Sequence, residues 1–130
     1  MRKVSCFIGI SLLFCFPLLS HGANTVTYDG GNSVMISGID SDWDYIDTFP
    51  DATKGLRVQS IIFYSDTTDD DIFIKDKDDT GVIIFPAKIA DGYDQRGWKY
   101  DCTRLKPYLD VSVGGAPSAN AFITIILCGE

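Results

Sequence analysis

The sequence predicts an all-β fold: a single antiparallel β-sandwich of the jelly-roll or Greek-key type, with seven to nine short strands. Runs of β-branched and aromatic residues recur along the chain, and clusters of Asp, Gly, Asn and Pro separate them. No stretch shows the 3.6-residue period of an amphipathic helix. With 130 residues, the chain has the length of one domain.

The first 23 residues have the three-part layout of a secretory signal peptide. Met1–Lys3 is basic, Phe7–Leu19 is apolar, and Ser20–Ala23 supplies small residues. The apolar run is shorter than the ~20 residues that span a bilayer, so we expect cleavage after Gly22 or Ala23 and no stable membrane span afterwards. An uncleaved anchor and a wrongly assigned start codon are the alternatives. Residues 24–130 then form one exported domain, periplasmic or extracellular.

Strand-like stretches follow one another through this domain. A less regular one, Tyr45–Phe49, is a ninth candidate, and a short helical turn is expected at Asp51–Lys54 or at Asp101–Leu105. The eight regular stretches are Thr25–Tyr28, Ser33–Ile36, Leu56–Tyr64, Asp71–Lys75, Val82–Ala87, Trp98–Asp101, Tyr108–Val113 and Ala121–Cys128.

Turn-forming residues separate these strands, because Asp, Asn and Gly adopt tight or left-handed backbone conformations at little cost. Two strands, Leu56–Tyr64 and Ala121–Cys128, are apolar on both faces over part of their length. Such strands are covered on both sides or contact a second chain. The turn segments are Asp29–Asn32, Thr67–Asp70, Asp78–Gly81, Asp91–Asp94 and Gly114–Pro117.

The cleaved chain contains no histidine, which excludes a Ser-His-Asp triad, a Cys-His pair and an imidazole metal site. We therefore expect no enzyme. Two cysteines remain, Cys102 and Cys128, and in an exported domain they indicate one disulfide. Nine basic against 18 acidic residues give a formal charge of −9, which argues against nucleic-acid binding.

The acidic residues are 17 Asp and a single Glu. Most of this excess suits turns, because the short Asp side chain accepts hydrogen bonds from nearby backbone N–H groups. Asp40, Asp42 and Asp44 suggest an alternative, since alternate carboxylates offer the oxygen ligands that Ca²⁺ prefers. No cofactor is expected otherwise.

Five aromatic residues lie beside acids or glycines near predicted strand ends. In a β-sandwich, such residues either pack in the core and at assembly contacts or form a glycan-binding surface, where rings stack on sugars and acids bind hydroxyls. The five are Trp43, Tyr45, Tyr93, Trp98 and Tyr100.

The stretches Gly55–Phe63, Asp71–Asp76, Thr80–Phe85 and Leu105–Leu109 carry a family resemblance. Over residues 48–113 the chain resembles small β-sandwich proteins encoded among phage and prophage structural genes. The shared features are the strand spacing and a Lys-Pro-Tyr step ending at Tyr108. The resemblance implies a virion or assembly subunit, with no active site to carry over.

Together these features predict a non-catalytic exported protein that acts by surface contact. The first expectation is a structural or assembly subunit, phage-derived if the resemblance holds, whose partner is a second copy or another protein. The alternative is a small glycan-binding module assisted by calcium.

Overall fold

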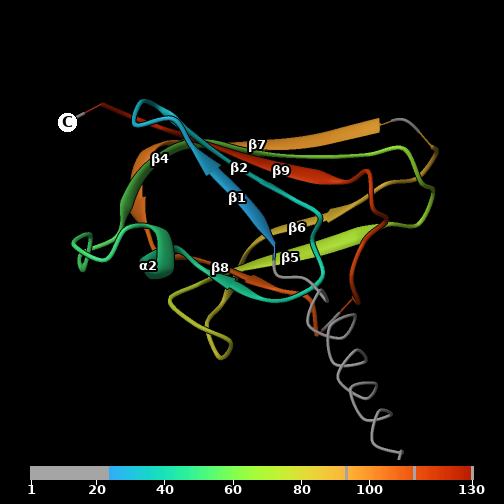
Figure 1. Ribbon diagram of the computed structural model, residues 1–130, viewed down its shortest axis with the longest axis horizontal. Coiled ribbons are helices and arrows are strands. Elements are labelled where there is room, and N and C mark those ends of the chain that lie inside the picture. Colours follow the sequence, from blue (N-terminus) through green and yellow to red (C-terminus); the bar gives the residue numbers. More distant parts are fainter. Residues whose placement is uncertain (1–23, 93, 113, 130) are drawn as a thin grey trace, which may run out of the picture.

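The computed structural model describes residues 24–92, 94–112 and 114–129, which form two antiparallel sheets packed as a sandwich (Figure 1). The predicted all-β sandwich is thus confirmed, whereas the expected signal peptide, residues 1–23, lies outside the described residues. The five-stranded sheet has the order β1 (Thr25–Tyr28), β2 (Ser33–Ser37), β9 (Phe122–Leu127), β4 (Leu56–Ser65) and β7 (Asp94–Leu105). The four-stranded sheet has the order β3 (Trp43–Asp44), β8 (Pro107–Asp110), β5 (Asp71–Asp76) and β6 (Ile83–Lys88).

The eight regular strands of the prediction all occur, seven of them with ends shifted by a few residues at most. Two local predictions are wrong. Tyr45–Phe49 is not a strand, because Asp44 accepts a hydrogen bond from the Ile46 N–H at 3.2 Å and so caps the short helix α2 (Tyr45–Thr48). Asp101–Leu105 is not helical but belongs to β7, which begins four residues earlier than predicted, at Asp94.

Few neighbouring strands are consecutive along the chain. Within the described residues only the β1–β2 and β5–β6 pairs are hairpins, and the chain otherwise crosses between the sheets. In Figure 1 the strands of the five-stranded sheet run across the upper part of the molecule, and β5, β6 and β8 lie below them. This crossing places β9, the last strand, at the middle of the five-stranded sheet.

A bulge in β4 determines which side chains reach the core. The register of β4 against both of its neighbours shifts between Val58 and Ser60. A β-bulge adds one residue and reverses the faces that follow it. Val58 before the bulge and Ile61 and Phe63 after it are therefore all fully buried, while Gln59 is exposed.

The core lies between the inner faces of the two sheets. Aliphatic side chains dominate it, and burying each contributes about 1.5–3 kcal/mol relative to exposure. Phe63, Ile61, Ile123 and Ile125 come from the five-stranded sheet, and Ile74 and Leu109 from the four-stranded one.

The disulfide links the two strands on either side of β4. Cys102 lies in β7 and Cys128 directly after β9, and their Cα atoms are 5.7 Å apart. Strands two positions apart in a sheet are separated by about 9.6 Å, so the chain must leave regular geometry to make this link. It does so at Asp101 and Cys102, whose φ angles of 49° and 63° are left-handed.

The cysteine pair thus lies at disulfide distance, as the sequence predicts, and is compatible with an oxidising compartment. No helix among the described residues is long and apolar enough to cross a membrane.

The double substitution Cys102→Ala with Cys128→Ala should lower the free energy of unfolding by about 3.5 kcal/mol, because the closed loop spans 26 positions of sequence. Urea titrations of both proteins would measure this, with the reduced wild type as a control that should match the double variant. A loss below ~1 kcal/mol would show that the link does not constrain the chain.

Candidate functional site

Two of the five aromatic residues expected to bind a ligand belong to the core. Trp43 and Tyr45 are 5% and 4% exposed, and the indole N–H of Trp43 donates to Thr48 Oγ1 at 3.1 Å. Neither ring presents a face to solvent. The prediction of a ligand surface is therefore wrong for these residues, because β3 and α2 direct them inward.

The other three aromatic residues do not form a shared ligand surface either. Tyr100 is half-buried, its hydroxyl donates to the Ile84 carbonyl at 2.6 Å, and burial raises its pKa to about 12. Trp98 is 66% exposed on the edge strand β7. Tyr93 lies outside the described residues. Among the described members, Trp98 alone is open to a ligand.

The Asp40, Asp42 and Asp44 series does not converge on a metal site. Asp44 caps α2, and Asp42 accepts from the Tyr108 hydroxyl and the Val111 N–H, both at 2.8 Å. The bond to Asp42 raises the pKa of Tyr108 to about 12. No group of three His, Cys, Asp or Glu side chains in the described part of the chain could hold a metal ion. Alternation in sequence therefore does not group these three carboxylates as a Ca²⁺ site requires, and Asp42 and Asp44 are engaged within the chain instead.

One acid forms a buried ion pair that the sequence did not reveal. The Lys75 ammonium donates to Asp110 Oδ2 at 2.6 Å and to the Asp79 carbonyl at 2.6 Å. The Asp110 side chain is 2% exposed, and its bond to Lys75 lowers its pKa. Because Lys75 lies on β5 and Asp110 on β8, the pair joins two strands far apart in sequence.

A second acidic cluster holds one end of the sandwich together. Ser65, fully buried at the end of β4, donates to Asp70 Oδ2 at 2.5 Å, and the same carboxylate oxygen accepts from the Ser118 N–H at 2.9 Å. Asp66 accepts from the Asn120 amide at 2.8 Å, which lowers the pKa of this acid. These acids serve loop structure, as the turn interpretation predicts.

The outer face of the five-stranded sheet is the most unusual surface. Residues paired across neighbouring strands lie on the same face of a sheet. One such row crosses all five strands on the outer face and comprises Thr27, Met35, Thr124, Ile62 and Gly97. We call this surface the contact face. Its members are Thr25, Thr27, Ser33, Met35, Ser37, Ser60, Ile62, Tyr64, Gln95, Gly97, Lys99, Phe122, Thr124 and Ile126.

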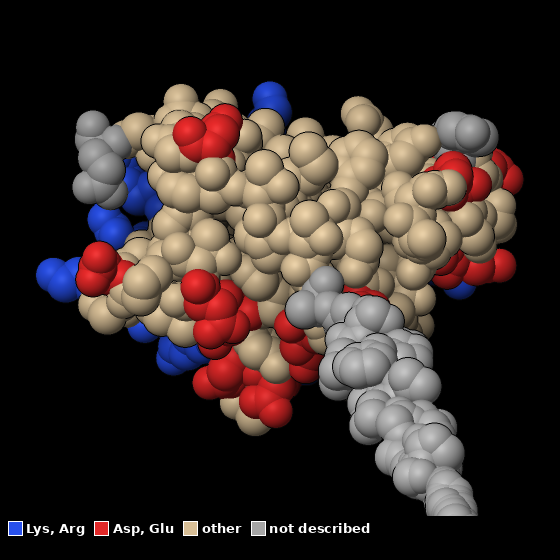
Figure 2. Space-filling model, in the orientation of Figure 1, with Lys and Arg blue, Asp and Glu red and all other residues tan. Residues whose placement is uncertain are grey.

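Lys99 is the one charged residue among these members, and beyond the bulge the same outer face also carries Arg57 and its cross-strand partner Arg104. None of these residues is acidic, although the chain has 18 acidic residues. Figure 2 shows acidic side chains along the lower edge, at the right-hand end and at the upper left of the molecule, with a band of uncharged residues across the middle of this view.

The contact face is not flat but has a hollow and a projecting side chain. Gly97 leaves space beside Ile62, where an added Cβ would come within 3.4 Å of Ile62 Cγ1. The result is a hollow of about 240 Å³. Tyr64 and Phe122 stack nearby with their ring centroids 4.9 Å apart. Met35 projects from the same face with 43% of its surface exposed.

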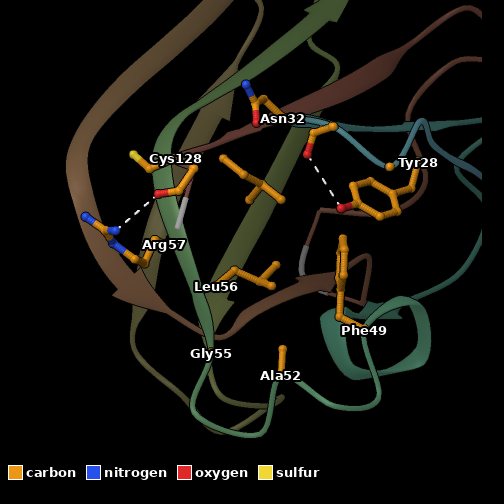
Figure 3. Close-up of a pocket in the computed structure, with 12 residues that line it drawn as sticks. Tyr28, Asn32, Phe49, Ala52, Gly55, Leu56, Arg57 and Cys128 are labelled. Atoms are coloured by element: carbon orange, nitrogen blue, oxygen red, sulfur yellow. Dashed lines mark hydrogen bonds between the residues drawn. The ribbon is translucent and has the colours of Figure 1, made fainter.

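A separate pocket opens at one end of the sandwich (Figure 3). Its volume is about 380 Å³. It lies between the β1–β2 turn, the loop after α2 and the ends of β4 and β9, and we call it the end pocket. Its lining comprises Tyr28, Gly30, Gly31, Asn32, Phe49, Ala52, Gly55, Leu56, Arg57, Leu127, Cys128 and Gly129.

Tyr28 and Phe49 are not among the candidate site residues that the sequence predicts, although both are aromatic and each adjoins a turn. The signal available was an aromatic residue directly before an Asp-Gly-Gly-Asn turn.

Comparisons of the chain with protein-family models, with curated proteins and with solved structures found no match.

Calcium should hardly change thermal stability if the Asp residues serve turns and ion pairs. We expect a difference in Tm below ~3 °C between millimolar CaCl₂ and excess EDTA, measured at ionic strength high enough to screen the diffuse negative charge. A site filled at 100 times its Kd would add about 2.7 kcal/mol, or roughly 10 °C. A shift of that size with Ca²⁺ and not with Mg²⁺ would contradict the prediction.

Asp110→Asn should destabilise the protein by about 3 kcal/mol at pH 7, because it leaves the Lys75 ammonium without its buried partner. The Asp110 pKa is lowered on folding, so its contribution is complete above the unfolded value near 3.9 and is lost as the pH falls through the folded value. The variant should therefore lose less stability than wild type on acidification below about pH 4. Urea unfolding from pH 2 to 7 measures both effects, with the exposed-loop variant Asp91→Asn as the control that should behave like wild type.

Proposed function

We propose that this protein is a non-catalytic, exported structural subunit that associates with further copies of itself through the contact face. The observation that carries the proposal is the absence of acidic side chains from this face in a chain with 18 acidic residues. Charged residues are depleted from the cores of protein interfaces.

Electrostatics favours this face over any other for contact between copies. Each copy carries a formal charge of −7, or −9 without the expected signal peptide, so surfaces that bear acids repel their equivalents. At physiological salt this repulsion extends only about 8 Å. Two copies can therefore approach closely where neither presents acids, and the contact face meets that condition.

The raised and hollow parts of the contact face fit those of a second copy related by a two-fold axis. Met35 on β2 and Ile62 on β4 lie on opposite sides of Thr124, which is on the central strand β9. A two-fold axis along β9 would place Met35 of each copy over Ile62 of the other, beside the hollow at Gly97. Met is flexible and fills irregular gaps well, so the exposed side chain suits this hollow.

The expected association is weak for a single pair. Five strands ~4.8 Å apart and about five residues ~3.4 Å apart give a flat area of about 400 Å² per copy, below the ~800 Å² per partner of a standard interface. Such contacts suit an assembly in which many copies act together. A virion of the kind suggested by the resemblance over residues 48–113 is one assembly of this type.

Two features support export as part of the proposal. The basic start, apolar run and small residues within residues 1–23 have the layout of a signal peptide. The disulfide between Cys102 and Cys128 is compatible with an oxidising compartment outside the cytoplasm.

Sedimentation velocity from ~10 µM to ~1 mM should show reversible dimerisation with a Kd weaker than ~1 µM. Thr124→Glu, which puts a charge at the centre of the contact face, should weaken dimerisation at least tenfold. Thr53→Glu makes the same change on an exposed loop and should leave the affinity of dimerisation unchanged. A wild-type protein that stays monomeric at the highest concentration, or equal effects of the two variants, would refute the assignment of this face.

A further inference from the structure

The end pocket has an apolar floor and an aromatic wall. Leu56 is 7% exposed and, with Leu127, closes the bottom. Tyr28 and Phe49 stand at one side in edge-to-face contact, with ring centroids 4.7 Å apart and an interplanar angle of 71°. Figure 3 shows both rings on the side opposite Arg57 and Cys128. Because Tyr28 is 42% exposed, its ring is open to a ligand.

The rim of the end pocket is polar but almost uncharged. The Tyr28 hydroxyl donates to the Gly31 carbonyl at 3.5 Å, a long bond that a ligand hydroxyl could replace. The Asn32 side-chain amide adds further donors and an acceptor, and the carbonyls of Gly31, Gly55 and Gly129, which each accept one hydrogen bond, keep a second lone pair. These groups lie around the apolar floor, an arrangement typical of small-molecule sites.

Charge restricts the class of ligand. None of the twelve lining residues is Asp or Glu, and Asp29 in the adjoining turn accepts from the Gly31 N–H at 2.7 Å, so the lining itself offers a cation no counter-charge. Arg57 is the single cationic residue of the lining, and its guanidinium donates to the Gly129 carbonyl at 3.2 Å rather than projecting among the rings (Figure 3). An anion would also have to approach a chain with a formal charge of −7. A neutral ligand fits these conditions.

We propose that the end pocket binds a neutral pyranose ring of a glycan, with one ring face against Tyr28 and Phe49 and its hydroxyls on the rim formed by Asn32 and the glycine backbone. A sugar ring combines an apolar C–H face with hydroxyl edges, which matches an aromatic wall beside a polar rim. The volume of about 380 Å³ lies in the lower part of the range of ligand pockets and suits one or two rings.

The site is distinct from the contact face. Successive residues of a strand point to opposite sides, so on β1 Thr27 lies on the contact face while Tyr28 faces the end pocket. Binding of sugar and association of copies can therefore be tested separately.

The test uses glucose, galactose, mannose and N-acetylglucosamine, each added to ¹⁵N-labelled protein at a concentration where it is monomeric. At least one sugar should bind with a Kd near 1 mM, and the shifted amide signals should belong to Tyr28 through Asn32 and to Phe49. Tyr28→Ala should weaken binding at least tenfold, and Asn32→Ala, which keeps the aromatic wall, should weaken it severalfold. Trp98→Ala removes the other strongly exposed aromatic residue and should leave binding unchanged.

Three results would overturn the proposal. The first is no saturable shift with any of the four sugars up to ~50 mM, far above the expected Kd. The second is a shift centred on Trp98. The third is tighter binding of N-acetylphenylalanine amide than of every sugar, because the pocket would then be a site for an aromatic side chain of a protein partner. None of these results bears on the dimerisation measured for the contact face.

Discussion

The bulge in β4 is the feature on which the rest of the structure depends. If β4 continued from Val58 in regular alternation, Ile61 and Phe63 would face outward and Ile62 and Tyr64 would face the core. At the same place β7 is irregular too, since its residues 100–102 lie opposite Gln59, and Cys102 there reaches Cys128 across β4. Core packing, the contact face and the disulfide all follow from one irregularity at the centre of the five-stranded sheet.

Several acidic residues form hydrogen bonds or ion pairs that stabilise caps, loops and strand pairs of the fold. Asp44 and Asp42 satisfy backbone N–H groups at a cap and a loop, Asp70 joins two loops through serines, and Asp110 pairs with Lys75. These roles use carboxylates where a short acceptor stabilises the chain. The contact face has none, which is the condition that the proposed association of copies requires.

Local sequence patterns predicted the strands because alternation and turn residues act over a few positions. They could not predict the bulge, because the residues from Leu56 to Ser65 fit a single strand whichever alternate set faces the core. Only the pairing of β4 with β7 and β9 determines which set does so. Trp43 and Tyr45 illustrate the same limit for the site. Their neighbouring acids suggested a surface, but the cap at Asp44 turned the chain into α2 and directed Tyr45 inward. The aromatic pair of the end pocket, Tyr28 and Phe49, comes from segments 21 positions apart that only the fold brings together.

The two proposed surfaces reinforce one another if both are correct. The contact face lies on the outer side of the five-stranded sheet, and the end pocket opens between its inner side and the loop after α2. Pairing of copies through the contact face therefore leaves every end pocket open. A single pocket with millimolar affinity binds a glycan only briefly, but copies held in one assembly bind a repeating glycan at high effective concentration and gain avidity without any new contact. Weak association and weak ligand binding are then suited to a protein that works in an array rather than alone.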